Sequence, residues 1–194
     1  RRVLEHDPPR DVRAAWVARH RPLVVVDSRL QLPPQAALFG PARPVLVYHA
    51  DRDAVREAAL RERGAVLVPL AAAHGKVDLP AMLHDLALRE VNELHVEAGA
   101  KLHGSFLRER LADELLVYLA PALLGRGQPM AEFGPLQALA GRVRMEFSSV
   151  ERIGPDLRPL TPILAAAEGD IQGRPLGDRP DRGAQRPLQL VQVL

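Results

Sequence analysis

The chain contains no cysteine among its 194 residues. This absence excludes disulfide bonds, thiolate nucleophiles and thiolate zinc sites, and it suits a reducing cytoplasm. No apolar run approaches the roughly 20 residues that a membrane span needs, and no signal-peptide pattern opens the sequence. We therefore expect a soluble cytoplasmic protein that has no membrane partner.

An excess of charge of one sign and the common catalytic motifs are also missing. Lys and Arg total 26 against 24 Asp and Glu, so the net charge of +2 is too small to predict a nucleic-acid surface. The seven histidines show neither HxxxH nor HxH spacing, and neither a GxSxG elbow nor a P-loop is present. The sequence thus predicts no metal site and no nucleic-acid partner.

The hydrophobic share of 47% is enough for one sizeable core. In the first half of the chain, short β-branched runs alternate with segments of helical period. The predicted strands are residues 23–26, 45–48 and 66–68, and the predicted helices are residues 52–63 and 79–89. Such alternation predicts parallel strands joined by helical crossovers, which makes the fold α/β.

Residues 91–105 form the stretch in which we expect a site. An apolar run, which we expect to form the central strand of the sheet, ends in Glu97. The chain then turns at Gly99 and leads into a predicted helix over residues 101–110. In α/β sheets ligands bind at the carboxyl ends of strands, and helix N-termini offer N–H groups to anions. Ser28 ends the first predicted strand, so Ser28 and Glu97 could face one crevice. The alternative is that Glu97 is a solvated strand end, Ser28 a capping residue and Gly99 only a turn.

The pattern changes in the second half of the chain. Residues 114–120 form an apolar run, and residues 143–152 alternate between apolar and polar side chains. A Gly-Pro-Asp turn follows at residues 154–156. Consecutive strands with no room for a helix between them predict an antiparallel edge on a parallel sheet. Residues 159–194 are rich in Pro, Gly, Arg and Gln, and we expect an irregular tail there.

Four blocks of sequence resemble the reductase domain of the bacterial bifunctional riboflavin-biosynthesis deaminase/reductase. They are VVVDSRL (24–30), VNELHVEAGAKLHGSFL (91–107), ADELLVYLAPALLG (112–125) and VERIGPDLR (150–158). The resemblance implies a dihydrofolate-reductase-like fold, which is a mostly parallel sheet flanked by helices with antiparallel C-terminal strands. It also implies a homodimer that uses NADPH to reduce 5-amino-6-(5-phosphoribosylamino)uracil to its ribityl product. Residues 1–158 would be a partial reductase domain, and residues 159–194 the tail.

The resemblance also assigns site residues. The substrate contacts are Glu97, Arg13 and Arg10, and the guanidinium of Arg13 suits the substrate phosphate. The cofactor contacts are Ser28, His6, Gly99, Ala100, Lys101, Leu102, His103, Gly104 and Ser105. His6 stands where the family has an aspartate, and Arg10 where it has a leucine.

Two parts of the family pattern are absent from the sequence. The sequence lacks the family's first strand, substrate loop, helix and Gly-rich turn, which in the family precede the match that begins at Val3. At the other end, Pro159 is expected to interrupt the family's last strand. We therefore expect the chain by itself to self-associate and to show little reductase activity, and an upstream segment to restore an NADPH-binding dimer. Two alternatives stay open, a truncated or degenerate domain without catalysis and a reductase of the same fold with another substrate.

Overall fold

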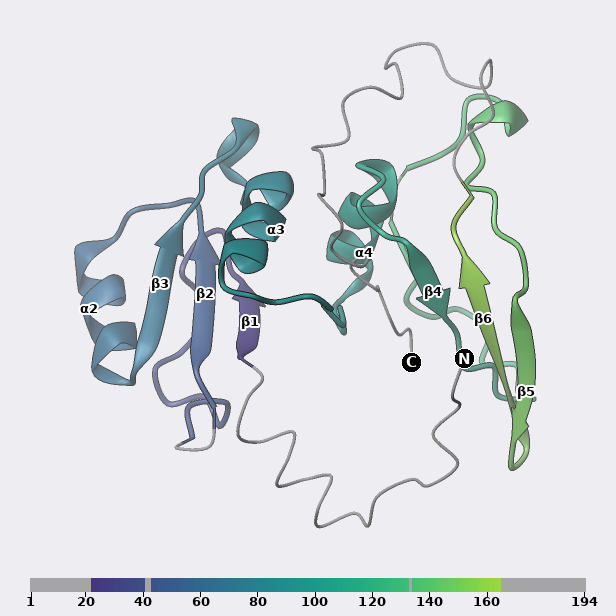
Figure 1. Cartoon of the computed structure of the whole chain (residues 1–194), viewed down its shortest axis with the longest axis horizontal. Helices are drawn as coiled ribbons and strands as arrows, with labels where there is room; N and C mark the ends of the chain where they lie inside the picture. The colour runs from purple at the N-terminus through teal and green to yellow at the C-terminus, as the bar shows by residue number, and fades with distance from the viewer. Residues whose placement is uncertain (1–21, 41–42, 133, 165–194) are drawn as a thin grey trace. The chain divides into compact units, whose positions relative to one another are not determined.

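The computed structural model describes residues 22–40, 43–132 and 134–164 (Figure 1). These residues fall into two compact units, one up to Asp85 and the other from Leu86 onward. The predicted α/β class is confirmed, with a parallel sheet in the first unit and an antiparallel sheet in the second. No helix among the described residues is long and apolar enough to cross a membrane.

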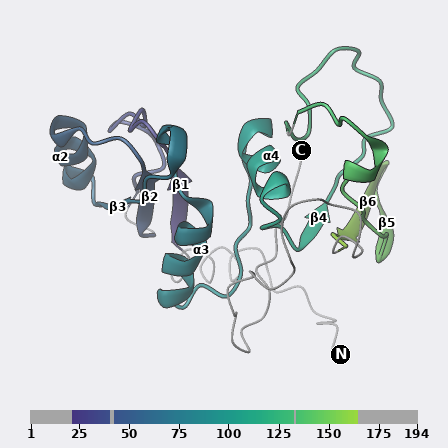
Figure 2. The ribbon, with the colours of Figure 1, turned by 90° about the horizontal axis from the view of Figure 1, so that it is seen from above.

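The first unit is built on three parallel strands in the order β1-β2-β3. Their bounds are Leu23–Val26 for β1, Val45–His49 for β2 and Ala65–Pro69 for β3. The middle strand β2 is buried along its whole length, as expected for an apolar run with a neighbour on each side and helices over its faces. Seen from above, α2 lies on one side of this sheet and α3 on the other (Figure 2). The three strands predicted from β-branched runs are thus confirmed.

The helix α2 spans Ala54–Glu62 and connects β2 to β3. The Asp53 side chain caps it by accepting hydrogen bonds from the N–H groups of Val55 and Arg56 at 3.1 and 3.0 Å. Gly64 follows the helix with a φ of 83°, a left-handed conformation that glycine adopts without strain. These two local signals confirm the helix predicted over residues 52–63.

Glu57 on α2 is a buried carboxylate, only 7% exposed, held by arginines. The hydrogen bond from Arg61, at 2.8 Å, lowers the pKa of Glu57 below its ordinary value of 4.5, although burial opposes the shift. When a carboxyl has a lower pKa in the folded state than in the unfolded state, its ionisation stabilises the fold at pH values above the ordinary pKa. This contribution to stability is lost as the pH falls through the folded pKa.

We expect Glu57→Gln to lower the free energy of unfolding by about 1 kcal/mol at about pH 7, because the amide loses the ionic part of these contacts. The difference from the wild type should be smaller at an acid pH well below 4.5, because the wild-type carboxyl loses its charge as the pH falls through the lowered pKa of Glu57. Urea denaturation at both pH values measures this. The exposed Glu62 on the same helix provides the control Glu62→Gln, and equal effects of the two substitutions would contradict the prediction.

The helix α3 spans Leu79–Leu88 and confirms the prediction over residues 79–89. Its apolar residues recur at helical spacing and are buried: Leu79, Met82, Leu83 and Leu86. The hydroxyl of the fully buried Tyr48 donates a hydrogen bond of 2.6 Å to Asp85, which joins β2 to α3. A buried phenol with its own acceptor avoids the cost of an unpaired polar group.

The second unit contains α4 (Ala100–Arg108) and an antiparallel sheet. The strands are β4 (Glu114–Leu116), β5 (Ser149–Ile153) and β6 (Asp156–Pro162), in the order β4-β6-β5 (Figure 1). The turn between β5 and β6 has Gly154 at a φ of 60°, as its Gly-Pro-Asp sequence predicts. The antiparallel C-terminal strands are thus confirmed, although β4 and β5 are shorter than the predicted runs. Among the described residues they form a sheet of their own and not the expected edge of the parallel sheet.

The expectation that Pro159 interrupts the last strand is wrong. The strand β6 lies in the middle of its sheet and continues through Pro159 to Pro162. Pro159 has no N–H group to donate, but its carbonyl accepts a hydrogen bond from Val117 at 3.1 Å. Because β4 ends at Leu116, this proline costs the sheet one ladder hydrogen bond at the very end of a short strand.

The expected central strand that leads to Glu97 is also wrong. Residues 91–99 are not paired with any strand among the described residues. An apolar run becomes a strand only where a neighbour accepts and donates the ladder hydrogen bonds, and the run itself cannot supply that neighbour. The helix that follows is confirmed and begins one residue earlier than predicted, at Ala100.

Candidate functional site

Glu97 lies in the unpaired segment just before α4. Its side chain is exposed and makes no hydrogen bond or ion pair with the described residues. Val96, the residue before it, is buried and anchors the segment to the interior of the second unit. Among the described residues nothing bonds to the carboxylate of Glu97, so its acceptor oxygens are presented to solvent.

The N-terminus of α4 carries free backbone donors directly after Glu97. Gly99 is the N-cap residue, and no side chain caps the helix. The N–H groups of Gly99, Ala100 and Lys101 donate to no described residue, while those of Leu102 and His103 are turned back to the carbonyl of Gly99. A Cβ added at Gly99 would meet nothing within 4 Å, so open space lies over these groups. Three free donors, a positive helix end and the exposed Lys101 suit a phosphate.

The remaining predicted cofactor residues lie inside the helix. Leu102 is half-buried, and His103 and Gly104 are buried. The hydroxyl of Ser105 donates to the carbonyl of Lys101 at 3.1 Å. The predicted cofactor contacts over residues 99–105 thus lie mostly in the first two turns of α4, so only the first of these residues offer free backbone groups.

Sequence reasoning missed the loop over residues 130–132, which lies against α4. The N–H of Glu132 donates to the carbonyl of Ala100 at 2.8 Å. A Cβ on Gly104 would overlap the backbone carbonyl of Glu132, so the two backbones are in direct contact. The one sequence signal is a glycine within a predicted helix, which indicates the close approach but not its partner.

Ser28 belongs to the first unit and follows β1. Its hydroxyl oxygen accepts from the N–H of Val77 at 3.3 Å, and its carbonyl accepts from Ala50 and Asp51 at 3.1 and 2.8 Å. The hydroxyl proton is left to donate, so Ser28 both holds the turn and can bind a ligand. A crevice shared by Ser28 and Glu97 stays a prediction. His6, Arg10 and Arg13 lie outside the described residues.

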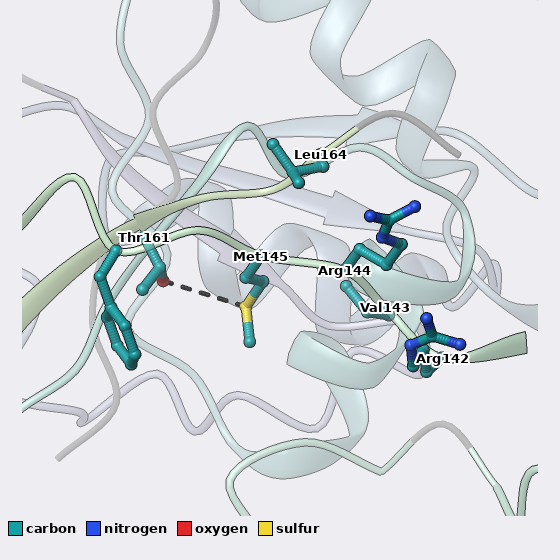
Figure 3. Close-up of a pocket in the computed structure, with 7 residues that line it drawn as sticks. Arg142, Val143, Arg144, Met145, Thr161 and Leu164 are labelled. Atoms are coloured by element: carbon teal, nitrogen blue, oxygen red, sulfur yellow. Dashed lines mark hydrogen bonds between the residues drawn. The ribbon is translucent and has the colours of Figure 1, made fainter. Parts of the chain in front are cut away.

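One pocket of the second unit lies beside β6 and is shown in Figure 3. It has a volume of about 400 Å³. The Thr161 hydroxyl lies 3.9 Å from the sulfur of Met145 within it and donates its proton to the carbonyl of Leu115 at 2.8 Å. Its lining residues are Arg142, Val143, Arg144, Met145, Phe147, Thr161 and Leu164. None of them is a predicted site residue. Within the described ranges no group of three acidic or histidine side chains could hold a metal ion.

Comparison with known proteins decides the family. The family model described as the RibD C-terminal domain matches residues 1–158. The chain belongs to this RibD C-terminal domain family. The family that the four sequence blocks predicted is therefore confirmed.

Individual RibD relatives agree with this result. RibD of Aquifex aeolicus is 24% identical over 155 residues, which are 80% of this chain and 42% of that protein. The 5-amino-6-(5-phosphoribosylamino)uracil reductase of Buchnera aphidicola subsp. Acyrthosiphon pisum is 32% identical over 84 residues, 43% of this chain and 41% of that protein. The structure of Acinetobacter baumannii RibD aligns with a TM-score of 0.61 and 25% identity, over 73% of this chain and 37% of that chain. This chain thus spans less than half the length of each of these three relatives.

Proposed function

We propose that this chain reduces 5-amino-6-(5-phosphoribosylamino)uracil to its ribityl product, with NADPH as the reductant. The observation that carries the proposal is the row of free N–H groups over residues 99–101, placed directly after the free carboxylate of Glu97. The family match over residues 1–158 supports the same reaction. We also propose that the protein works as a cytoplasmic homodimer, as the family resemblance implies.

The residues at the start of α4 fit a phosphate of the cofactor. Free N–H groups at a helix N-terminus bind phosphate oxygens by charge-assisted hydrogen bonds, and the helix dipole adds to this attraction. The open space over Gly99 admits the group, and Lys101 adds a positive charge. When bound, NADPH supplies the hydride that opens the ribose to the ribityl chain.

The chain's own share of the reaction is orientation. In the proposal Glu97 accepts hydrogen bonds from the substrate and holds it beside the cofactor phosphate site. Ser28 donates its free hydroxyl proton to the cofactor, and Arg10 and Arg13 contact the substrate. When the protein holds the two reactants in this way, the binding free energy offsets the entropy that the reactants lose on coming together.

The reaction is tested by NADPH oxidation in the presence of the aminouracil substrate. We assay the 194-residue chain and also the chain preceded by whatever its genomic reading frame encodes upstream of Arg1. The proposal expects turnover in at least one of the two forms, and sedimentation of the active form as a dimer. The absence of turnover in both forms, with no substrate binding by calorimetry, would show that the proposed reaction is wrong.

Glu97→Gln tests the role of the carboxylate. We expect it to raise the KM for the aminouracil about tenfold, because a hydrogen bond to a charged group contributes about 1.5–3 kcal/mol. The affinity for NADPH should stay within about twofold of the wild-type value, because the free N–H groups belong to the helix backbone. The exposed Glu93 on the same segment gives the control Glu93→Gln. An equal loss of both affinities would show that Glu97 acts through the fold and not on the substrate, and an unchanged KM would favour a merely solvated carboxylate.

A further inference from the structure

His103 is a buried side chain that joins three parts of the second unit. It lies on α4, and its residue is only 6% exposed. Its Nε2 atom lies 3.2 Å from the backbone nitrogen of Ala98, and its Nδ1 atom lies 3.2 Å from the carbonyl oxygen of Met130. The ring thus bridges the segment that carries Glu97 and the loop over residues 130–132.

The two contacts define which ring nitrogen carries the proton. The carbonyl of Met130 can only accept a hydrogen bond, so Nδ1 must donate. The N–H of Ala98 can only donate, so Nε2 must accept. A ring with its proton on Nδ1 alone satisfies both partners. The carbonyl of Val96 also lies 3.2 Å from Nε2, but it would be bonded only by a ring that carries a proton there.

We propose that His103 is a positioning residue, which fixes the Glu97 peptide and thereby aims the Glu97 carboxylate at the substrate. The proposal rests on the proposed function. Across residues 92–98, Ala98 has the only backbone N–H that donates to another described residue. This N–H belongs to the peptide that joins Glu97 to Ala98. Because the segment has no strand ladder, the imidazole takes the place of the missing neighbour and sets the plane of that peptide.

The second contact of the ring connects this peptide to the start of α4. The loop that accepts from Nδ1 at Met130 also donates from Glu132 to the carbonyl of Ala100 at 2.8 Å. The ring and the loop thus hold the segment with Glu97 and the first turn of α4 as one piece. A histidine here acts through its neighbours, because its buried ring has both nitrogens engaged.

Two conservative substitutions separate the two contacts. In His103→Gln the amide oxygen reaches the position of Nε2 and can accept from Ala98, whereas in His103→Asn the amide nitrogen reaches the position of Nδ1 and can donate to Met130. We expect His103→Asn to raise the KM for the aminouracil about tenfold. On a logarithmic scale, we expect the rise in KM of His103→Gln to be at most half of the rise in His103→Asn. Neither substitution should change the NADPH affinity more than about twofold, since the donors at residues 99–101 belong to the backbone.

The exposed His95 on the same segment provides the control His95→Gln, which should leave the KM unchanged. A residue with a merely structural role would lower the thermal stability of the Asn and Gln variants alike without separating their KM values. Equal KM values for these two variants would therefore overturn the proposal.

Two measurements need no turnover and keep this proposal separate from the proposed function. Ring-nitrogen NMR of the wild type should find the proton of His103 on Nδ1. Amide hydrogen exchange should find Ala98 protected in the wild type and in His103→Gln but not in His103→Asn. If the wild type turns over no aminouracil, the proposed function fails, while an unprotected Ala98 or a proton on Nε2 would overturn the anchoring role of His103 itself.

Discussion

Gly104→Ala is expected to destabilise the second unit by about 3–5 kcal/mol, a large part of the stability of a small domain. A Cβ at residue 104 would overlap the backbone carbonyl of Glu132 and lie 2.9 Å from the backbone nitrogen of that residue. These atoms are backbone, so no rotamer change removes the clash. The loop over residues 130–132 would have to leave α4 and break its hydrogen bonds to Ala100 and His103.

The sign of this effect is the informative part. Alanine stabilises an exposed helix position by about 1 kcal/mol relative to glycine, so propensity alone predicts a gain at Gly104. Gly99→Ala is the matched control, since a Cβ there would meet nothing within 4 Å and should change the stability by less than about 1 kcal/mol. Urea denaturation of the two variants makes the comparison. A Gly104→Ala chain as stable as the wild type would show that the loop does not lie against the helix.

Gly99→Val is expected to weaken NADPH binding about a hundredfold. The isopropyl group would occupy the open space over the free N–H groups of Ala100 and Lys101 and keep a phosphate oxygen from reaching them. The loss of two charge-assisted hydrogen bonds, each of about 1.5–3 kcal/mol, accounts for this magnitude. Isothermal titration of NADPH measures the affinity directly.

The structure supplies the reason why this substitution reports on the ligand. Gly99 has a φ of −75°, which valine adopts without strain, so the fold itself should tolerate the change. Gly127 lies in the same unit with equally open space around it, and Gly127→Val is therefore the control for a new exposed side chain. An unchanged NADPH affinity in Gly99→Val would remove the start of α4 from the cofactor site.

The sequence by itself determined the elements whose signals are local. The strands β1, β2 and β3 follow from β-branched runs, because these residues fit a pleated and buried surface. The helix α2 follows from its helical period and the glycine after its end, and α3 from the spacing of its apolar residues. The family was also readable from four blocks of sequence, since the motif residues stand close together in the chain. The start of the proposed site at Glu97 and Gly99 was predicted for the same reason, since these residues also stand close together in the chain.

Only the tertiary structure decided the features that depend on a distant backbone. The run before Glu97 has the composition of a strand but pairs with no described neighbour, whereas β6 keeps its place in the sheet despite Pro159. Gly104 is required because the backbone of Glu132 lies against it. His103 is held by one backbone group before α4 in the chain and by another that follows 27 positions after the histidine. A strand ladder, a close backbone approach and a ring tautomer each need a partner that local sequence does not specify.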